Sequence, residues 1–260
     1  MHLALRKKNR IVRFLRWLGL KFYTVWVLTV FTVFMLLYLP GILVPFIFGM
    51  RAGAVSYKFL KLWSWTFSIL NFIHYDVRGR EHVDRKKAYI YACNHTSFLD
   101  LPGISIALPT QFRPLAKKEL LKIPVFGWIA RSACVIVDRS SNQSRKQSMN
   151  HLKEILGAGI SILIFPEGTQ NRTTELLQPF YDGAFRIAID TQQPILPMIS
   201  INAGTLMPPG KAFIQPGKIR IVIGTEITTA GLTAEDLPAL RQRTYDVMLG
   251  MLKANGAVHS

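Results

Sequence analysis

The hydrophobic pattern of the first 75 residues is typical of a membrane segment. No residue from Phe22 to Met50 is charged, and the 18 residues of Phe22–Leu39 suit a helix. A membrane-spanning helix needs about 20 predominantly apolar residues. Pro40, Gly41 and Pro45 follow directly. We therefore expect one helix, a break and a second apolar piece.

A second charge-free stretch, Leu62–Tyr75, is too short to span a bilayer comfortably. It contains several aromatic residues that suit the membrane interface: Trp63, Trp65, Phe67, Phe72 and Tyr75. Basic residues flank the apolar region on both sides. A hairpin or re-entrant pair of helices keeps those charges on the cytoplasmic side. The alternatives are a single-pass anchor and a signal peptide cleaved near residues 52–54, and the long apolar stretch argues against cleavage.

From Asp76 onward, short apolar runs alternate with helical segments. We expect strands at Ala88–Cys93, Gln111–Ala116, Ala133–Val137, Ile160–Phe165, Ile195–Ile201 and Ile219–Gly224. We expect helices at Phe98–Ala107, Glu119–Ala130, Ser144–Gly157, Gly183–Thr191 and Ala234–Lys253, the last opened by a capping box of Thr233 and Asp236. The pattern predicts an α/β domain over residues 76–260, with a mostly parallel central sheet flanked by helices. A membrane-embedded helix pair within residues 1–75 precedes it.

The charge distribution supports a membrane partner. The formal net charge is +17, of which +10 lies in residues 1–75, a segment without Asp or Glu. A basic stripe beside an apolar segment fits an anionic membrane surface. Nucleic acid is the competing partner, but the basic run carries no recognised binding motif. We therefore expect membrane lipids as partners, no nucleic acid, and a main domain on the cytoplasmic face.

The cysteine and histidine content argues against a metal centre. The two cysteines, Cys93 and Cys134, both lie in expected strands and are interpreted as small buried hydrophobes. No CxxC pair, HExxH motif or other cluster of ligands occurs in the sequence. We expect neither a metal nor a cofactor.

The first stretch with candidate chemistry follows the expected strand Ala88–Cys93. His95 falls in a turn, and Asp100 falls near the first turn of the next helix, where the helix dipole favours a carboxylate. If the turn folds back, Asp100 holds one imidazole nitrogen as a donor and leaves the other free as a base. On spacing alone, the same pair equally fits a purely structural tie within a loop.

A second candidate stretch follows the expected strand Ile160–Phe165 and reads Pro166-Glu167-Gly168-Thr169-Gln170-Asn171-Arg172. In an open α/β sheet, ligands bind beyond the carboxyl ends of the strands, which is where this segment and His95 are expected. Gly168 permits an unusual backbone angle that exposes amide donors, and Arg172 can pair with phosphate. Taken alone, the segment also fits a plain surface turn.

Together these stretches resemble the 1-acyl-sn-glycerol-3-phosphate acyltransferases of the glycerolipid acyltransferase superfamily. The similarity runs from Asp76 to Gly224 and covers four motifs in order: Asn94-His95 with Asp100, Val135–Arg139, Phe165–Thr169, and Ile195–Met198. Two further pieces, Ala116–Leu120 and Pro124–Gly127, are also similar in sequence and order. Members of the family commonly carry an N-terminal membrane helix pair.

The resemblance implies transfer of a fatty acyl group from acyl-CoA or acyl-carrier protein to the sn-2 hydroxyl of lysophosphatidic acid. His95 would act as general base, oriented by Asp100. Lys117 and Arg172 would hold the phosphate. Arg139 would either contribute to the same site or form a salt bridge with Asp138 or another carboxylate. Glu167 would bind substrate hydroxyls or order the turn that it shares with Gly168 and Thr169.

Two positions depart from the family pattern and leave the headgroup open. Gln170 stands where arginine is usual, and Asp182 lies where a lysine-containing segment is common. Another lysolipid acceptor therefore remains an alternative. A non-catalytic lipid-binding protein and a thioesterase or lipase are the rivals from other classes. The Gly-x-Ser-x-Gly motif of α/β-hydrolases is absent from the sequence.

Overall fold

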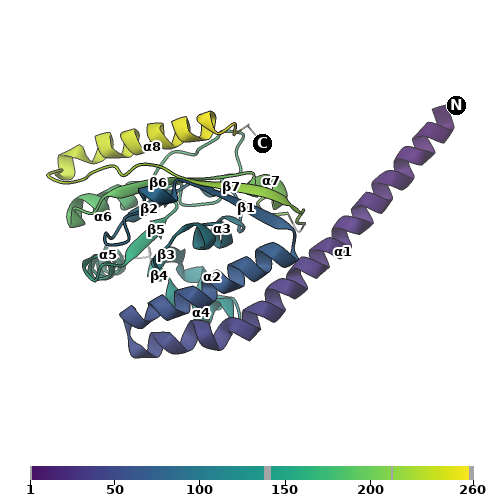
Figure 1. Ribbon diagram of the computed structural model, residues 1–260. Helices are drawn as coiled ribbons and strands as arrows, with labels where there is room; N and C mark the ends of the chain where they lie inside the picture. The colour runs from purple at the N-terminus through teal and green to yellow at the C-terminus, as the bar shows by residue number, and fades with distance from the viewer. Residues whose placement is uncertain (1, 138–141, 212, 258–260) are drawn as a thin grey trace.

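The computed structural model describes residues 2–137, 142–211 and 213–257. Its centre is a seven-stranded sheet in the order β1-β7-β6-β2-β5-β3-β4 (Figure 1). The strands are β1 Ile73–Arg78, β2 Ile90–Cys93, β3 Phe112–Lys117, β4 Val135–Val137, β5 Ser161–Ile164, β6 Ile195–Ile201 and β7 Gly217–Ile223. All neighbouring strands are parallel except β6 and β7, which are antiparallel. The expected mostly parallel α/β sheet is confirmed.

The six expected strands are all present, but the sequence interpretation missed β1. Ile73–Arg78 was grouped with the aromatic stretch that precedes it, although Ile73, Tyr75 and Val77 alternate with polar residues as in a strand with one face buried. The expected boundary between residues 75 and 76 therefore falls inside β1. The division of the chain into two parts stays a prediction.

The helices cover both faces of the sheet. They are α1 His2–Leu43, α2 Gly53–Leu70, α3 Asp100–Ala107, α4 Phe126–Ala133, α5 Asn142–Gly157, α6 Gly183–Thr191, α7 Ala203–Leu206 and α8 Leu237–Ala254. The single helix expected at Glu119–Ala130 is wrong. A 3₁₀ turn over Lys118–Lys122 and α4 replace it, because Pro124 cannot donate a helical hydrogen bond. The expected capping box of Thr233 and Asp236 is confirmed ahead of α8.

The N-terminal segment forms two helices packed side by side, α1 and α2 (Figure 1). Helix α1 continues through Pro40 to Leu43, so the break expected at Pro40 comes later, at the 3₁₀ turn Val44–Phe48. Pro40 removes one N–H donor from the helix, and only Gly41–Leu43 follow it before the helix ends. Among the described residues, only the segment Arg13–Phe48 is long and apolar enough to cross a membrane. The structure thus contains one such candidate rather than a clear membrane-embedded pair.

The aromatic residues of Leu62–Tyr75 do not all face outward as expected. Trp63, Phe67 and Tyr75 are buried, and the first two pack edge-on against Phe31 of α1. Trp65 and Phe72 are exposed. Aromatic rings contribute more by packing against each other than by lying singly on a surface. Trp63 and Phe67 therefore pack α2 against α1 instead of facing the membrane interface.

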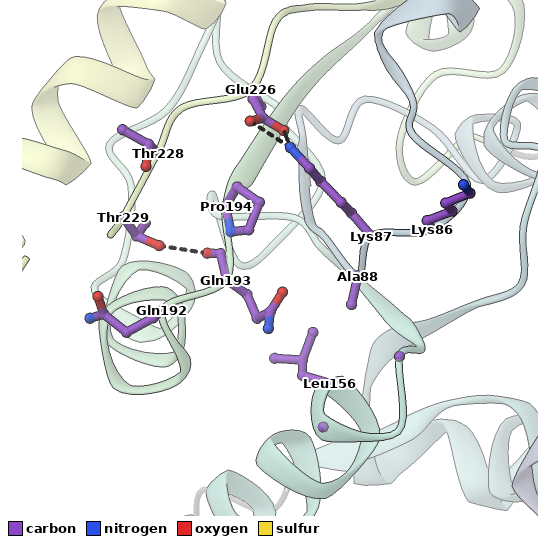
Figure 2. Close-up of a pocket in the computed structure, with 12 residues that line it drawn as sticks. Lys86, Lys87, Ala88, Leu156, Gln192, Gln193, Pro194, Glu226, Thr228 and Thr229 are labelled. Atoms are coloured by element: carbon purple, nitrogen blue, oxygen red, sulfur yellow. Dashed lines mark hydrogen bonds and ion pairs between the residues drawn. The ribbon is translucent and has the colours of Figure 1, made fainter. Parts of the chain in front are cut away.

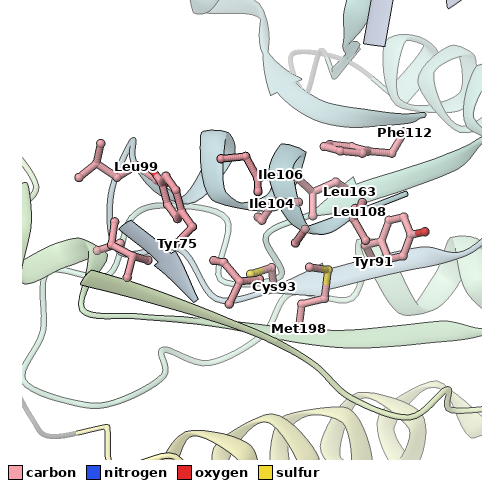
Figure 3. Close-up of a cluster of buried hydrophobic side chains, with 14 of the residues drawn as sticks. Tyr75, Tyr91, Cys93, Leu99, Ile104, Ile106, Leu108, Phe112, Leu163 and Met198 are labelled. Carbon is pink, nitrogen blue, oxygen red and sulfur yellow. The ribbon is translucent and has the colours of Figure 1, made fainter. Parts of the chain in front are cut away.

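Two apolar cores flank the sheet. The core that faces α1, α2 and α3 contains Tyr75, Cys93, Ile104 and Met198, which lie close together in Figure 3. The other core lies beneath α5, α6 and α8. Strands β2, β5 and β6 are buried on both faces, as expected for the central strands of a parallel sheet. This burial fixes the ends of these strands, from which the site residues extend.

Candidate active site

His95 and Asp100 form a hydrogen-bonded pair at the carboxyl end of β2. The chain leaves β2 at Cys93, and five residues after His95 helix α3 begins at Asp100. His95 Nδ1 lies 2.9 Å from Asp100 Oδ2. The histidine side chain is 19% exposed, and the aspartate side chain is fully buried. A buried carboxylate beside a partly exposed imidazole is the arrangement that orients a general base.

Further hydrogen bonds fix the Asp100 carboxylate. Its Oδ2 also accepts the backbone N–H groups of Thr96 at 2.8 Å and Ser97 at 2.9 Å. Its Oδ1 accepts the hydroxyl of Ser200 at 2.6 Å. The position at the first residue of α3 adds the favourable end of the helix dipole. These contacts offset the cost of burying a charge.

The imidazole ring of His95 is held between its acid partner and an aromatic face. Phe165 stacks on the ring with centroids 4.0 Å apart and planes 15° apart. With Nδ1 bonded to Asp100, no described residue bonds to Nε2. The geometry therefore leaves one ring nitrogen available to an incoming hydroxyl.

Glu167 connects the second candidate stretch to the first. Its Oε1 accepts the backbone N–H of His95 at 2.8 Å, and its Oε2 accepts that of Gln178 at 2.9 Å. Burial raises the pKa of Glu167 to about 7, against the opposing effect of these two backbone donors. The carboxylate is nearly inaccessible to solvent. Both oxygens thus order the turns, which is one of the two roles expected for this residue.

The turn after β5 requires a glycine. Gly168 has φ +70°, and a β-carbon there would lie 2.9 Å from the ring of Tyr181. Thr169 follows on the exposed surface of the turn. The backbone N–H of Asn171 then donates to the carbonyl of His95 at 2.6 Å. This bond places residues 168–172 directly beside His95.

The expected phosphate-binding residues lie at the same edge of the sheet. Lys117 is the last residue of β3 and is exposed. Arg172 is exposed and follows Asn171, with its guanidinium beside Gly210. Neither residue forms a hydrogen bond or ion pair with another described residue. Arg139 lies outside the described residues, so its expected role stays a prediction.

Three contributors to this site were missed by the sequence interpretation: the stacking ring of Phe165, the amide of Asn94 and the hydroxyl of Ser200. Asn94 was identified only as part of a motif, without a role. Ser200 had one detectable signal, a lone hydroxyl in an apolar strand. Its partner lies 100 residues away in sequence, so spacing alone could not reveal the contact.

Cys93 lies close to the site but is unsuited to act as a nucleophile. Burial raises the pKa of its thiol well above the ordinary value, so the thiolate is not formed near neutral pH. Among the described residues, no group of three or more His, Cys, Asp or Glu side chains is placed to hold a metal ion.

A separate cavity of about 480 Å³ lies at the opposite, amino edge of the sheet. Figure 2 shows the ion pair of Lys87 and Glu226 there, with Gln193 and Pro194 beside it. Ala88 lies two residues before β2 and lines this cavity, whereas His95 follows the other end of the same strand. The cavity is therefore remote from the His95–Asp100 pair.

Comparison with known proteins gives consistent results. Residues 74–201 match the family model described as Acyltransferase. The chain is 30% identical over 223 residues to 1-acyl-sn-glycerol-3-phosphate acyltransferase alpha of Mus musculus, covering 84% of this chain and 77% of the relative. It is 33% identical over 183 residues to 1-acyl-sn-glycerol-3-phosphate acyltransferase of Saccharomyces cerevisiae, covering 69% and 60% of the two chains.

A solved structure has the same fold. The crystal structure of the 1-acyl-sn-glycerophosphate (LPA) acyltransferase PlsC from Thermotoga maritima aligns with a TM-score of 0.80 at 24% sequence identity. The alignment covers 94% of this chain and 99% of the other. The extent of the sequence similarity, together with the paired His95 and Asp100, leads to one assignment. The chain belongs to the 1-acyl-sn-glycerol-3-phosphate acyltransferase family, whose members are acyltransferases.

Proposed function

We propose that this enzyme transfers a fatty acyl group from a thioester, acyl-CoA or acyl-carrier protein, to the sn-2 hydroxyl of lysophosphatidic acid, giving phosphatidic acid. The names of its relatives support this acceptor. The observation that carries the mechanism is the 2.9 Å contact between His95 Nδ1 and the buried Asp100.

In this mechanism His95 Nε2 removes the proton from the acceptor hydroxyl as its oxygen attacks the thioester carbonyl carbon. Asp100 keeps the proton on Nδ1 and stabilises the imidazolium that forms. The carbon–sulfur bond then breaks, and the imidazolium returns a proton to the departing thiolate. The substrate hydroxyl is the nucleophile, so no serine or cysteine of the enzyme is acylated.

Lys117 and Arg172 supply the positive charge for the phosphate. Both are exposed at the carboxyl edge of the sheet, and neither is paired with another described residue. A guanidinium can bind phosphate through two parallel hydrogen bonds, whereas lysine acts as a point charge. Arg139 is a third candidate from the family pattern. Gly168 and Thr169 line the turn between His95 and Arg172, where the substrate backbone would lie.

The membrane supplies the lipid acceptor. Many apolar side chains of α1 are exposed, including Phe22, Val25 and Leu37, and such a surface is stable only against lipid or protein. The basic residues that flank the apolar stretch favour a cytoplasmic location for the α/β domain. His95 would then meet lysolipids at the cytoplasmic face of the bilayer.

An acceptor and donor panel tests the proposal. Purified full-length enzyme in detergent–lipid micelles is incubated with labelled acyl-CoA or acyl-carrier protein and one lysolipid at a time. We expect labelled phosphatidic acid from lysophosphatidic acid with at least one donor. Exclusive acylation of a neutral or zwitterionic lysolipid would support the alternative headgroup that Gln170 leaves open. Release of free fatty acid alone would indicate a thioesterase, and no product would indicate a lipid-binding protein.

A further inference from the structure

Ser200 is an unusual residue for its place in the fold. Every other residue of β6, which reads Ile-Leu-Pro-Met-Ile-Ser-Ile, is apolar, and the strand is buried on both faces. A hydroxyl in an apolar interior costs free energy unless it is hydrogen-bonded. Packing alone would be served better by alanine or valine. The hydroxyl therefore calls for a specific explanation.

The alternation of β6 aims this hydroxyl at the active site. Leu196, Met198 and Ser200 share one face of the strand, and the first two belong to the core that also contains Cys93. Ser200 Oγ donates to Asp100 Oδ1 at 2.6 Å. Of the described residues, Ser200 alone bonds to this oxygen, because the other three donors bond to Oδ2.

The backbone of Ser200 is fixed to the residue before His95. The Asn94 side chain donates to the Ser200 carbonyl at 3.0 Å and accepts the Ser200 N–H at 2.7 Å. Asn94 follows Cys93, which lies opposite Met198 in the pairing of β2 with β6. The Asn94 amide thus continues the strand pairing after the β2 backbone turns away. One residue of β6 is therefore bonded to both sides of the catalytic turn.

We propose that Ser200 is a positioning residue for acyl transfer, whose hydroxyl sets the orientation of the Asp100 carboxylate. This inference rests on the proposed function, in which His95 is the base. A carboxylate bonded through both oxygens cannot rotate about its Cβ–Cγ bond. The hydroxyl also draws negative charge toward Oδ1 and away from Oδ2, the oxygen that faces His95.

Removal of the hydroxyl has a defined expected effect. We expect kcat to fall about 10- to 100-fold, the scale of one hydrogen bond to a charged group. KM should change less than about twofold, because a buried residue of this kind does not reach the substrate. Negative charge then returns to Oδ2 and favours the protonated imidazole. The acidic limb of the pH–rate profile should therefore move to higher pH.

The test uses four variants of the full-length enzyme: Ser200→Ala, Ser200→Thr, Ser200→Val and Ser161→Ala. Threonine and valine have the same shape, but only threonine carries a hydroxyl, so this pair separates hydrogen bonding from packing. Ser161 is a matched control, since it is also buried in a central strand and accepts the N–H of Tyr89 at 3.0 Å. Its substitution should lower the melting temperature and leave the pH profile unmoved.

A second readout does not require turnover. Ring ¹⁵N signals of labelled histidine follow the titration of His95, identified by its loss in His95→Ala. The midpoint should move upward in the alanine and valine variants and stay in place in the threonine and Ser161→Ala variants. Equal kcat in the threonine and valine variants, or an unmoved midpoint in Ser200→Ala, would overturn the proposal. An inactive wild type with a shifted midpoint would refute the proposed function and retain the role of Ser200.

Discussion

Charged side chains differ in burial and hydrogen bonding between the two edges of the mostly parallel sheet. At the amino edge, Lys87 and Glu226 pair at 3.0 Å beside the cavity of about 480 Å³, with side chains 48% and 39% exposed. At the carboxyl edge, Asp100 is fully buried and accepts four hydrogen bonds. An exposed ion pair contributes little to stability, whereas a buried carboxylate is tolerated only when it is fully bonded.

This contrast shows which structural feature identifies the reaction site. The polar residues that line the cavity at the amino edge could form their hydrogen bonds with water equally well. The volume of this cavity therefore does not indicate a reaction site. The hydrogen-bond network at the carboxyl edge buries a charge at a cost in free energy, and this indicates a functional role. A buried, fully hydrogen-bonded charge beside a partly exposed base is the better guide to the reaction site.

The largest expected effect comes from Asp100→Asn, which removes the charge but keeps the shape. The asparagine carbonyl can accept the three N–H donors that now reach Oδ2, and its amide can donate to Ser200, whose hydroxyl can turn to accept. The fold should therefore survive. We expect kcat to fall ~10²–10⁴-fold because the imidazolium loses its counter-charge. Kinetics and circular dichroism together measure this, and near-normal kcat would contradict it.

The next effect concerns the phosphate. Lys117→Ala and Arg172→Ala should each raise KM for lysophosphatidic acid about 10- to 100-fold, with kcat changed far less, because each removes a charge-assisted contact. Arg172→Lys should restore little of the lost affinity if the guanidinium binds the phosphate through two parallel hydrogen bonds. Lys122→Ala, an exposed charge of the neighbouring 3₁₀ turn, is the control. Equal KM values in all of these variants would exclude this phosphate site.

Glu167 should make the stability of the folded protein depend on pH. Its pKa is about 7 in the folded protein and 4.5 in the reference state, so the folded state binds the proton more tightly. The contribution of Glu167 to stability should therefore be fully present below pH 4.5 and be lost as pH rises through about 7, by on the order of 1–3 kcal/mol. Chemical unfolding across this range, compared with Glu167→Gln, isolates the contribution. A difference between the two proteins that does not vary with pH would contradict this assignment.

The smallest effect is expected at the amino edge. Lys87→Ala removes the exposed ion pair with Glu226 and leaves the contacts of His95 and Asp100 intact. We expect unchanged kcat, unchanged KM and a melting temperature within experimental error. A clear loss of activity would mean that the cavity in Figure 2 takes part in the reaction, and the contrast between the edges would fail.

Much of the fold could be predicted from the sequence because its central strands are short, apolar and separated by helices with clear signals. β5, for example, was evident from the continuous run that ends before Pro166. β1 was missed because its alternating pattern follows the apolar helix α2 after only two residues, Asn71 and Phe72. Similarly, Trp63 and Phe67 resemble interfacial aromatics until their packing against Phe31 is known.

The candidate site was predictable only where its residues are close in sequence. His95 and Asp100 lie within one turn, so their pairing follows from spacing. The contacts of Asp100 with Ser200, and of Glu167 with His95, join segments brought together by strand order. Strand order depends on tertiary packing, which local periodicity does not encode.

The most direct test of the account is the rate of acyl transfer by purified His95→Ala. With labelled acyl donor and lysophosphatidic acid at saturation, we expect a rate ~10²–10⁴-fold below wild type, because the acceptor hydroxyl loses its base. Circular dichroism and melting temperature should stay close to wild type, since the imidazole is partly exposed. A correctly folded His95→Ala protein that transfers acyl groups at the wild-type rate would contradict the account.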